Sequence, residues 1–211
     1  MRRGLFITFE GQECAGKSTQ VQLLTEWLES QGHRVLCTRE PGGTALAEKI
    51  RNLLLNISEE SICAESELLL FAASRAQHVR NLILPALAEG KTVLCDRFYD
   101  STTAYQGAAR GLPLAVINVL NDFCTADRKP DLTFLLDLTV QESRRRLRIR
   151  SHDTVDRMES EKDSFFEKVR QGFLQIARQE PERVKCIDAT QDIQVIQQFI
   201  RTEVQNALSR D

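Results

Sequence analysis

The sequence predicts an α/β fold, a five-stranded parallel sheet with helices on both faces. Short apolar runs alternate with segments in which apolar residues recur at helical spacing, which is typical of strand–helix–strand units. A glycine-rich loop, residues 11–18, also separates the first run from the first helical pattern. Loops of this kind join a strand to a helix in phosphate-binding folds. We expect one domain over residues 1–211, because this length suits a single full core.

Five β-rich runs account for the expected sheet. The run at residues 91–98 has a nearly continuous apolar core, as expected for a strand buried on both faces of a parallel sheet. In chain order, the expected strands lie within residues 4–11, 33–40, 91–98, 132–138 and 183–189.

Helical patterns fill the intervals between these runs. Residues 19–31 carry apolar side chains at helical spacing, and Gly32 stands where a helix-ending cap is expected. The pattern resumes over residues 45–55 and 65–88, with a kink expected at Pro85 because proline lacks an N–H. A last helix closes the chain, and its apolar side chains share one face: Val195, Ile196, Phe199, Ile200, Val204 and Leu208.

Composition and charge argue against several classes of protein. The net charge is −2 and the isoelectric point about 6.0, whereas a duplex-binding protein usually carries a basic face, so we expect no nucleic-acid partner. The six cysteines are irregularly spaced without a CxxC pair, which favours thiols in a cytoplasmic protein over a zinc site. The apolar run before Glu10 is too short for a signal peptide, and we expect no membrane span.

The loop at residues 11–18 carries the strongest chemical signal. It fits G-x-x-x-x-G-K-[ST] at every fixed position and lies between an expected strand and an expected helix. In such a P-loop, backbone N–H groups wrap an anion, Lys17 reaches the β and γ phosphates, and the Ser18 hydroxyl ligates Mg²⁺. A glycine turn that only joins strand to helix fits this context less well. We expect a nucleoside triphosphate site formed by Gly11, Gln12, Glu13, Cys14, Ala15, Gly16, Lys17, Ser18 and Thr19.

Further polar residues follow the second and third expected strands. Asp96 ends the third strand, where a carboxylate is placed to hold Mg²⁺ through water. Arg97 beside it offers paired donors that suit a phosphate. Phe71 and Arg75 stand four residues apart, so one helix face carries a ring for stacking and a guanidinium for hydrogen bonding. Taken singly, each residue also fits a structural role as a strand-end cap, surface ion pair, core ring or solvated charge.

Four motifs in this order resemble those of the bacterial thymidylate kinases: FEGxxxAGKST, TREPGGT, LLFAASR and DRFYDSTTAYQGAARG. The resemblance covers nearly the whole chain, including PDLTFLLDL and the segment that follows it. It implies a homodimeric enzyme that transfers the γ-phosphoryl group of ATP to dTMP with Mg²⁺, giving dTDP and ADP for dTTP biosynthesis. It also implies a P-loop kinase fold with a short arginine-rich lid.

The resemblance implies roles for individual side chains. Phe71 stacks on the thymine, Arg75 donates to its exocyclic oxygen, and Tyr105 crowds the sugar 2′ position. Residues 188–190 lie on the adenine side. Thr102 lies by the base edge and Gln106 helps to hold the base or sugar. Arg51 and Arg97 hold the acceptor phosphate, and Glu40 lies near it. No general base is needed, because a phosphomonoester is already an oxyanion, so Lys17 and the arginines act by alignment and charge neutralisation.

An arginine-rich segment after the fourth run is expected to form a mobile surface lid, approximately residues 144–159. A solvated helix face is the plainer interpretation of the whole arginine run: Arg144, Arg145, Arg146, Arg148 and Arg150. The resemblance places a lid here that closes over ATP and supplies an arginine when the P-loop lacks one, as this loop does at Cys14. We favour Arg150 for this role, then Arg148, with Arg157 as a third candidate. Two assignments stay open: Glu13 to a place near the acceptor sugar or the metal, and Glu159 to the metal or substrate side.

Two other functions remain as alternatives. One is a different nucleoside or deoxynucleoside monophosphate kinase of the same fold, against which the Phe71/Arg75 pair and the Thr102/Tyr105/Gln106 set argue. The other is a nucleotide-controlled switch protein. That class commonly recognises guanine through an N/T-K-x-D motif, which the sequence lacks.

Overall fold

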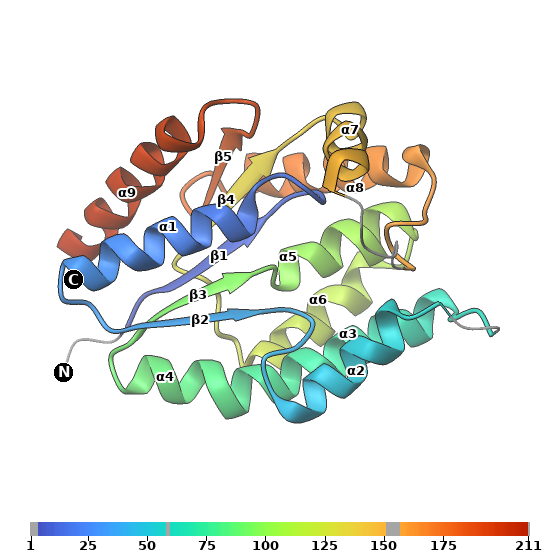
Figure 1. Ribbon diagram of the computed structural model, residues 1–211. Coiled ribbons are helices and arrows are strands. Elements are labelled where there is room, and N and C mark those ends of the chain that lie inside the picture. Colours follow the sequence, from blue (N-terminus) through green and yellow to red (C-terminus); the bar gives the residue numbers. More distant parts are fainter. Residues whose placement is uncertain (1–3, 58–59, 151–156, 211) are drawn as a thin grey trace.

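The computed structural model describes residues 4–57, 60–150 and 157–210, without the side chains of Arg150 and Arg210. Five parallel strands form one sheet in the order β2-β3-β1-β4-β5, which confirms the predicted sheet (Figure 1). The strands are β1 (Phe6–Glu10), β2 (Val35–Arg39), β3 (Thr92–Asp96), β4 (Leu132–Asp137) and β5 (Val184–Asp188).

The strand register brings the functional loops to one edge of the sheet. Asp96, the last residue of β3, is paired in register with Phe9 of β1 and with Arg39 of β2. The P-loop after β1, the segment after β2 and the segment after β3 therefore leave the sheet side by side. Because all strands are parallel, their carboxyl ends share this edge, where ligand-binding residues of α/β sheets are found.

Helices cover both faces of the sheet (Figure 1). The apolar face of α1 joins that of α9 in one core cluster with β1 and β4, centred on Leu24, Phe134 and Ile200. On the opposite face, separate clusters join β3 to α4 and β4 to α8. The helices are α1 (Lys17–Ser30), α2 (Ala45–Leu55), α3 (Ala64–His78), α4 (Leu84–Ala88), α5 (Tyr99–Thr102), α6 (Leu114–Thr125), α7 (Val140–Arg150), α8 (Asp163–Gln179) and α9 (Ile193–Arg210).

The long helix expected over residues 65–88 is interrupted before the proline. A π-helical segment, η1 (Val79–Ile83), separates α3 from α4, and Pro85 lies in the first turn of α4. Proline cannot donate to the carbonyl four residues earlier and its ring clashes with that carbonyl, so the widened turn before it relieves both problems. A second π segment, η2 (Thr103–Ala109), carries Tyr105 and Gln106.

The lid expected at residues 144–159 begins inside a regular helix. The arginine run lies in α7, and residues 151–156 of the expected lid lie outside the described residues. Residues 157–160 form a turn before α8. Among the helices in the described ranges, none is long and apolar enough to cross a membrane.

Candidate active site

A cavity of about 560 Å³ opens at the carboxyl edge of the sheet. It runs from the P-loop to the start of η2, and most of the residues expected to bind substrates line it. These are Glu13, Cys14, Gly16, Lys17, Ser18, Thr19, Glu40, Arg51, Phe71, Arg75, Asp96, Arg97, Thr102, Tyr105 and Gln106. The expected loop residues Gly11, Gln12 and Ala15 and the lid candidates Arg148 and Arg157 are not part of this lining.

The P-loop is folded around the Lys17 ammonium group. Nζ donates to the carbonyl oxygens of Gly11 at 3.1 Å and Gln12 at 2.9 Å. Gly11 has a φ of 135°, and a Cβ there would lie 2.4 Å from the Leu136 carbonyl oxygen, so only glycine fits against β4. Burial lowers the pKa of Lys17, and the nearby Arg97 guanidinium adds to the effect. A bound phosphate would therefore meet a preformed, poorly hydrated positive charge.

Ser18 and Asp96 meet at the outer end of the P-loop. The Ser18 hydroxyl donates to Asp96 Oδ2 at 2.9 Å, which joins the start of α1 to the end of β3. A hydroxyl and a carboxylate are hard oxygen donors of the kind that Mg²⁺ prefers. No cluster of three or more His, Cys, Asp or Glu that could hold a metal occurs in the described ranges. These two side chains therefore fit an ion that takes its remaining ligands from phosphate and water.

Glu13 and Arg97 both line the cavity and form an ion pair. Arg97 Nη2 donates to Glu13 Oε1 at 2.7 Å, and the Tyr105 hydroxyl donates to the same oxygen at 3.2 Å. The Arg97 guanidinium also lies 5.4 Å from the centre of the Tyr105 ring. Burial by itself raises the pKa of Glu13, but Arg97 and Lys17 outweigh it and lower that pKa. Glu13 thus stays ionised and links the P-loop to the residue expected at the acceptor phosphate.

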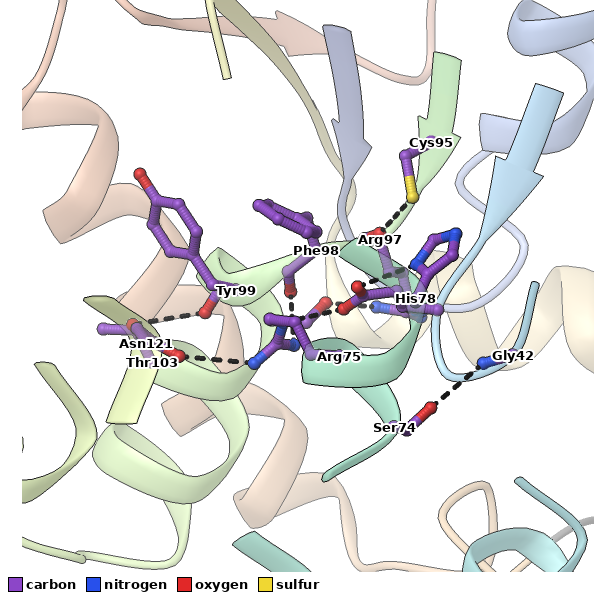
Figure 2. Close-up of polar contacts among 12 residues, drawn as sticks. Gly42, Ser74, Arg75, His78, Cys95, Arg97, Phe98, Tyr99, Thr103 and Asn121 are labelled. Atoms are coloured by element: carbon purple, nitrogen blue, oxygen red, sulfur yellow. Dashed lines mark hydrogen bonds and ion pairs between the residues drawn. The ribbon is translucent and has the colours of Figure 1, made fainter. Parts of the chain in front are cut away.

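Arg75 also lines the cavity and is held by three acceptors. Its Nε donates to Glu40 Oε2 at 2.7 Å, Nη2 to the Phe98 carbonyl oxygen at 3.2 Å and Nη1 to Asn121 Oδ1 at 3.3 Å. Figure 2 shows Arg75 between Phe98 and Asn121. A guanidinium has five N–H groups, so two remain for a ligand in the cavity. The structure thus gives Arg75 a fixed orientation and spare donors.

Glu40 helps to hold Arg75 in this orientation, a role beyond the predicted place near the acceptor phosphate. It is 4% exposed, and its second oxygen lies 3.0 Å from His78 Nδ1. His78 Nε2 in turn lies 2.7 Å from the Thr38 hydroxyl on β2. The carboxylate therefore bridges two residues one turn apart on α3 and fixes Arg75 relative to the sheet. The sequence indicated Glu40 as a site residue, but not these partners.

The arginines of the lid region face different ways. Arg146 lines the cavity and donates to the carbonyl oxygens of Cys14 at 3.4 Å and Ala189 at 3.1 Å. Arg144 instead donates to Asp163 at 2.9 Å and to the Glu159 carbonyl oxygen at 2.8 Å. Position 150 lies one turn beyond position 146 on the same side of α7. The side of the helix that carries both positions is therefore the P-loop side.

The other lid candidates occupy different surroundings. Arg157 lies 2.7 Å from Glu67 and donates to the Leu54 carbonyl oxygen at 2.7 Å, which fastens the turn at residues 157–160 to α2 and α3. Arg148 is exposed on α7. Arg146 had no predicted role, although its position four residues before Arg150 was a usable signal. Glu159 lines the cavity, and its assignment to the substrate side stays a prediction.

Glu10 is a buried acid beside the site that sequence reasoning missed. It ends β1 immediately before the P-loop, is 0% exposed, and accepts from Phe98 N at 2.8 Å and from the Ser101 hydroxyl at 2.6 Å. Ser101 in turn accepts from Arg97 Nη1 at 3.3 Å. Burial raises the pKa of Glu10 to about 7, and the nearby Asp100 carboxylate adds to the shift. Its position at a strand's carboxyl end was the only sequence signal.

This raised pKa makes stability depend on pH. Between the ordinary pKa of 4.5 and about 7, folded Glu10 keeps a proton that the unfolded chain loses, so stability falls as pH rises. We expect Glu10→Gln to remove this loss. The free energy of unfolding of the original protein, minus that of the variant, should fall by up to about 3 kcal/mol from pH 5 to pH 8. Urea denaturation of both proteins across this range measures it, and a constant difference would contradict it.

The fold and the site define a P-loop kinase: a phosphate loop between β1 and α1 shares one cavity with an aromatic and arginine-lined acceptor end. The family model for thymidylate kinase matches residues 9–200. The thymidylate kinase of Desulfosudis oleivorans is 52% identical over 190 residues, covering 88% of this chain and 89% of the relative. That of Pseudomonas entomophila is 49% identical over 207 residues, covering 98% of each chain. This chain belongs to the thymidylate kinase family.

A solved structure supports the same conclusion for the fold. The crystal structure of thymidylate kinase from Ehrlichia chaffeensis matches with a TM-score of 0.77 and 38% sequence identity. The match covers 96% of this chain and 99% of that one. The P-loop, the parallel sheet and the helices on both faces are therefore those of the family.

Proposed function

We propose that this protein transfers the γ-phosphoryl group of ATP to dTMP, giving dTDP and ADP, in the synthesis of dTTP. The observation that carries the proposal is the cavity itself, which joins the P-loop at one end to Phe71 and Arg75 at the other. We propose a single kinase domain with its lid at residues 144–159. The six cysteines, all within the described ranges, form no disulfide, which suits a reducing cytoplasm.

The division of charge along the cavity suits phosphoryl transfer between two bound nucleotides. The P-loop amides and Lys17 hold the phosphates of ATP, and Arg97 and Arg51 hold the phosphate of dTMP. Ser18 and Asp96 would help to hold Mg²⁺, which would supply positive charge to the phosphates. The acceptor oxygen is already anionic, so these residues act by alignment and by stabilising charge that moves during transfer.

Tyr105 has the setting of a rigid wall against ribose. It is 6% exposed, and its ring packs against Phe165 and Phe173 with centroid distances of 6.0 Å and 6.2 Å. Its hydroxyl is held by Glu13. A ring fixed on both sides cannot move aside for an added 2′-hydroxyl, so it favours deoxyribose by exclusion.

A coupled assay of ADP release tests the proposal. We expect ADP release with ATP, Mg²⁺ and dTMP, and much slower release with dCMP, dGMP, dAMP and the ribonucleotide TMP. A faster reaction with another monophosphate would instead support the alternative, a kinase of the same fold with a different acceptor.

We further propose that the protein forms a homodimer through the outer face of α2, α3 and α6. These helices pack together, with α3 against both α2 and α6 (Figure 1). Their outer surfaces expose large apolar side chains, including Phe123 at 72% and Val119 at 68%. Large apolar side chains exposed on helices that pack together mark an interaction surface, and a two-fold axis allows such a face to pair with itself.

The oligomeric state of two matched variants tests the homodimer. We expect Phe123→Asp on α6 to shift the protein to a monomer in sedimentation experiments, because each subunit would bring a charge into the apolar contact. The same change at Phe199 on α9, which is 42% exposed, should leave the dimer intact. Dissociation by Phe199→Asp alone would place the interface on α9 instead.

A further inference from the structure

Glu67 is a buried carboxylate to which the proposed mechanism gives no role. It lies in the first turn of α3 and is 1% exposed. Its Oε1 accepts from Gln106 Nε2 at 2.8 Å and Arg110 Nε at 3.1 Å. Its Oε2 accepts from Arg110 Nη2 at 3.1 Å and lies 2.7 Å from Arg157 Nη1. Both oxygens of Glu67 thus face donors, and two of the three donor residues, Arg110 and Arg157, are cationic.

These contacts determine which way the Gln106 amide points. An ionised carboxylate only accepts hydrogen bonds, so Gln106 must turn its NH₂ group toward Glu67. Gln106 lines the cavity. Among the described residues none donates to its Oε1, and that atom is not one of the fully buried polar atoms that lack a partner. The Oε1 acceptor of Gln106 is therefore left for a molecule in the cavity, while its NH₂ group is held by Glu67.

The acceptor of Gln106 and the spare donors of Arg75 line the same cavity and form a complementary pair. Thymine offers an acceptor at O4 and a donor at N3–H, which match a guanidinium and a carbonyl oxygen. Cytosine reverses both groups, with an amino group at C4 and a lone pair at N3. A site built for one pattern leaves buried groups unpaired with the other, which gives strong discrimination.

We propose that Glu67 is a specificity-determining positioning residue, which holds the Gln106 amide so that its oxygen receives the N3–H of the acceptor base. This proposal rests on the proposed dTMP kinase activity and deepens it. Glu67 itself touches no substrate; it acts through Gln106.

Glu67→Gln is the sharpest change, because it keeps the shape and removes the obligatory acceptor. Two arginine donors face the Oε2 position and only one faces Oε1, so the oxygen of the new amide will take the Oε2 position and its NH₂ will face Gln106. Gln106 must then rotate and present its own NH₂ to the cavity. We expect kcat/KM for dTMP, divided by that for 5-methyl-dCMP, to fall roughly 10- to 100-fold. The second nucleotide keeps the methyl group and reverses only the hydrogen-bonding pattern.

Arg110→Met is the matched control. It removes two of the donors to Glu67 but leaves the carboxylate facing Gln106, so the ratio should stay at the value of the original protein. An equal fall in the ratio with both variants, or an unchanged ratio in Glu67→Gln, would overturn the proposal. Failure of the original protein to phosphorylate dTMP is a separate result, which would refute the proposed function itself.

A measurement on the unsubstituted protein applies even where Glu67→Gln does not fold. In protein labelled with ¹⁵N-glutamine, the Gln106 side-chain amide is assigned by its loss in Gln106→Leu. We expect its protons to exchange with solvent far more slowly than those of the exposed Gln198, because they face a buried carboxylate. Exchange as fast as that of Gln198 would refute the contact on which the proposal depends.

Discussion

Arg150→Ala is expected to lower kcat roughly 100- to 1000-fold while changing the KM for dTMP much less. The P-loop carries Glu13 and Cys14 at its centre, so the only cation within it is Lys17. A second positive charge must come from another segment, and position 150 lies on the side of α7 that faces the P-loop. An arginine that contacts the phosphates only during transfer affects kcat more than substrate binding. Steady-state kinetics with both substrates varied measures the two constants.

Two matched variants on the same helix control this prediction. Arg145→Ala removes an exposed arginine that pairs with Glu142 at 2.7 Å, and we expect nearly unchanged kinetics. Arg148→Ala tests the second candidate. If it is inactive while Arg150→Ala is near normal, the role belongs to Arg148. If both variants remain active, the proposed lid mechanism is wrong.

Glu40→Ala is expected to lower the free energy of unfolding by about 3–5 kcal/mol. The Glu40 side chain is 3% exposed and those of its partners Arg75 and His78 are 2% and 0% exposed. Removal of the carboxylate leaves the Arg75 guanidinium buried without its counter-charge, which costs far more than an exposed pair would. Urea denaturation measures the change. We also expect a higher KM for dTMP, because Arg75 loses the contact that orients it.

An exposed ion pair provides the comparison for Glu40→Ala. Glu89 pairs with Lys91 at 2.8 Å on the surface, with 57% of the Glu89 side chain exposed. Glu89→Ala should leave the free energy of unfolding nearly unchanged, because water solvates both charges once the pair is broken. A similarly small effect of Glu40→Ala would show that the buried network adjusts without this carboxylate.

Features that depend on neighbouring residues were predictable from the sequence. The P-loop motif is local, and its glycines, Lys17 and Ser18 lie where a strand–loop–helix unit requires them. The alternation of apolar runs and helical patterns predicted the five parallel strands, with ends within a few residues of those observed. Proximity of Asp96 to the P-loop followed from the rule that parallel strands end at one edge. The π segments η1 and η2 were not predicted, because apolar spacing does not distinguish a widened turn from a regular one.

The sequence by itself therefore determined the class of fold, the phosphate loop and the set of residues at the sheet edge, since each is encoded over short stretches of chain. Only the tertiary structure decided how the charges are paired. Glu67 meets Gln106, Glu10 meets Ser101 and Arg146 meets the P-loop carbonyl of Cys14 across 39, 91 and 132 positions of the chain. Buried charges must find partners wherever the folded chain brings them, and sequence spacing carries no record of distances that close only when the sheet assembles.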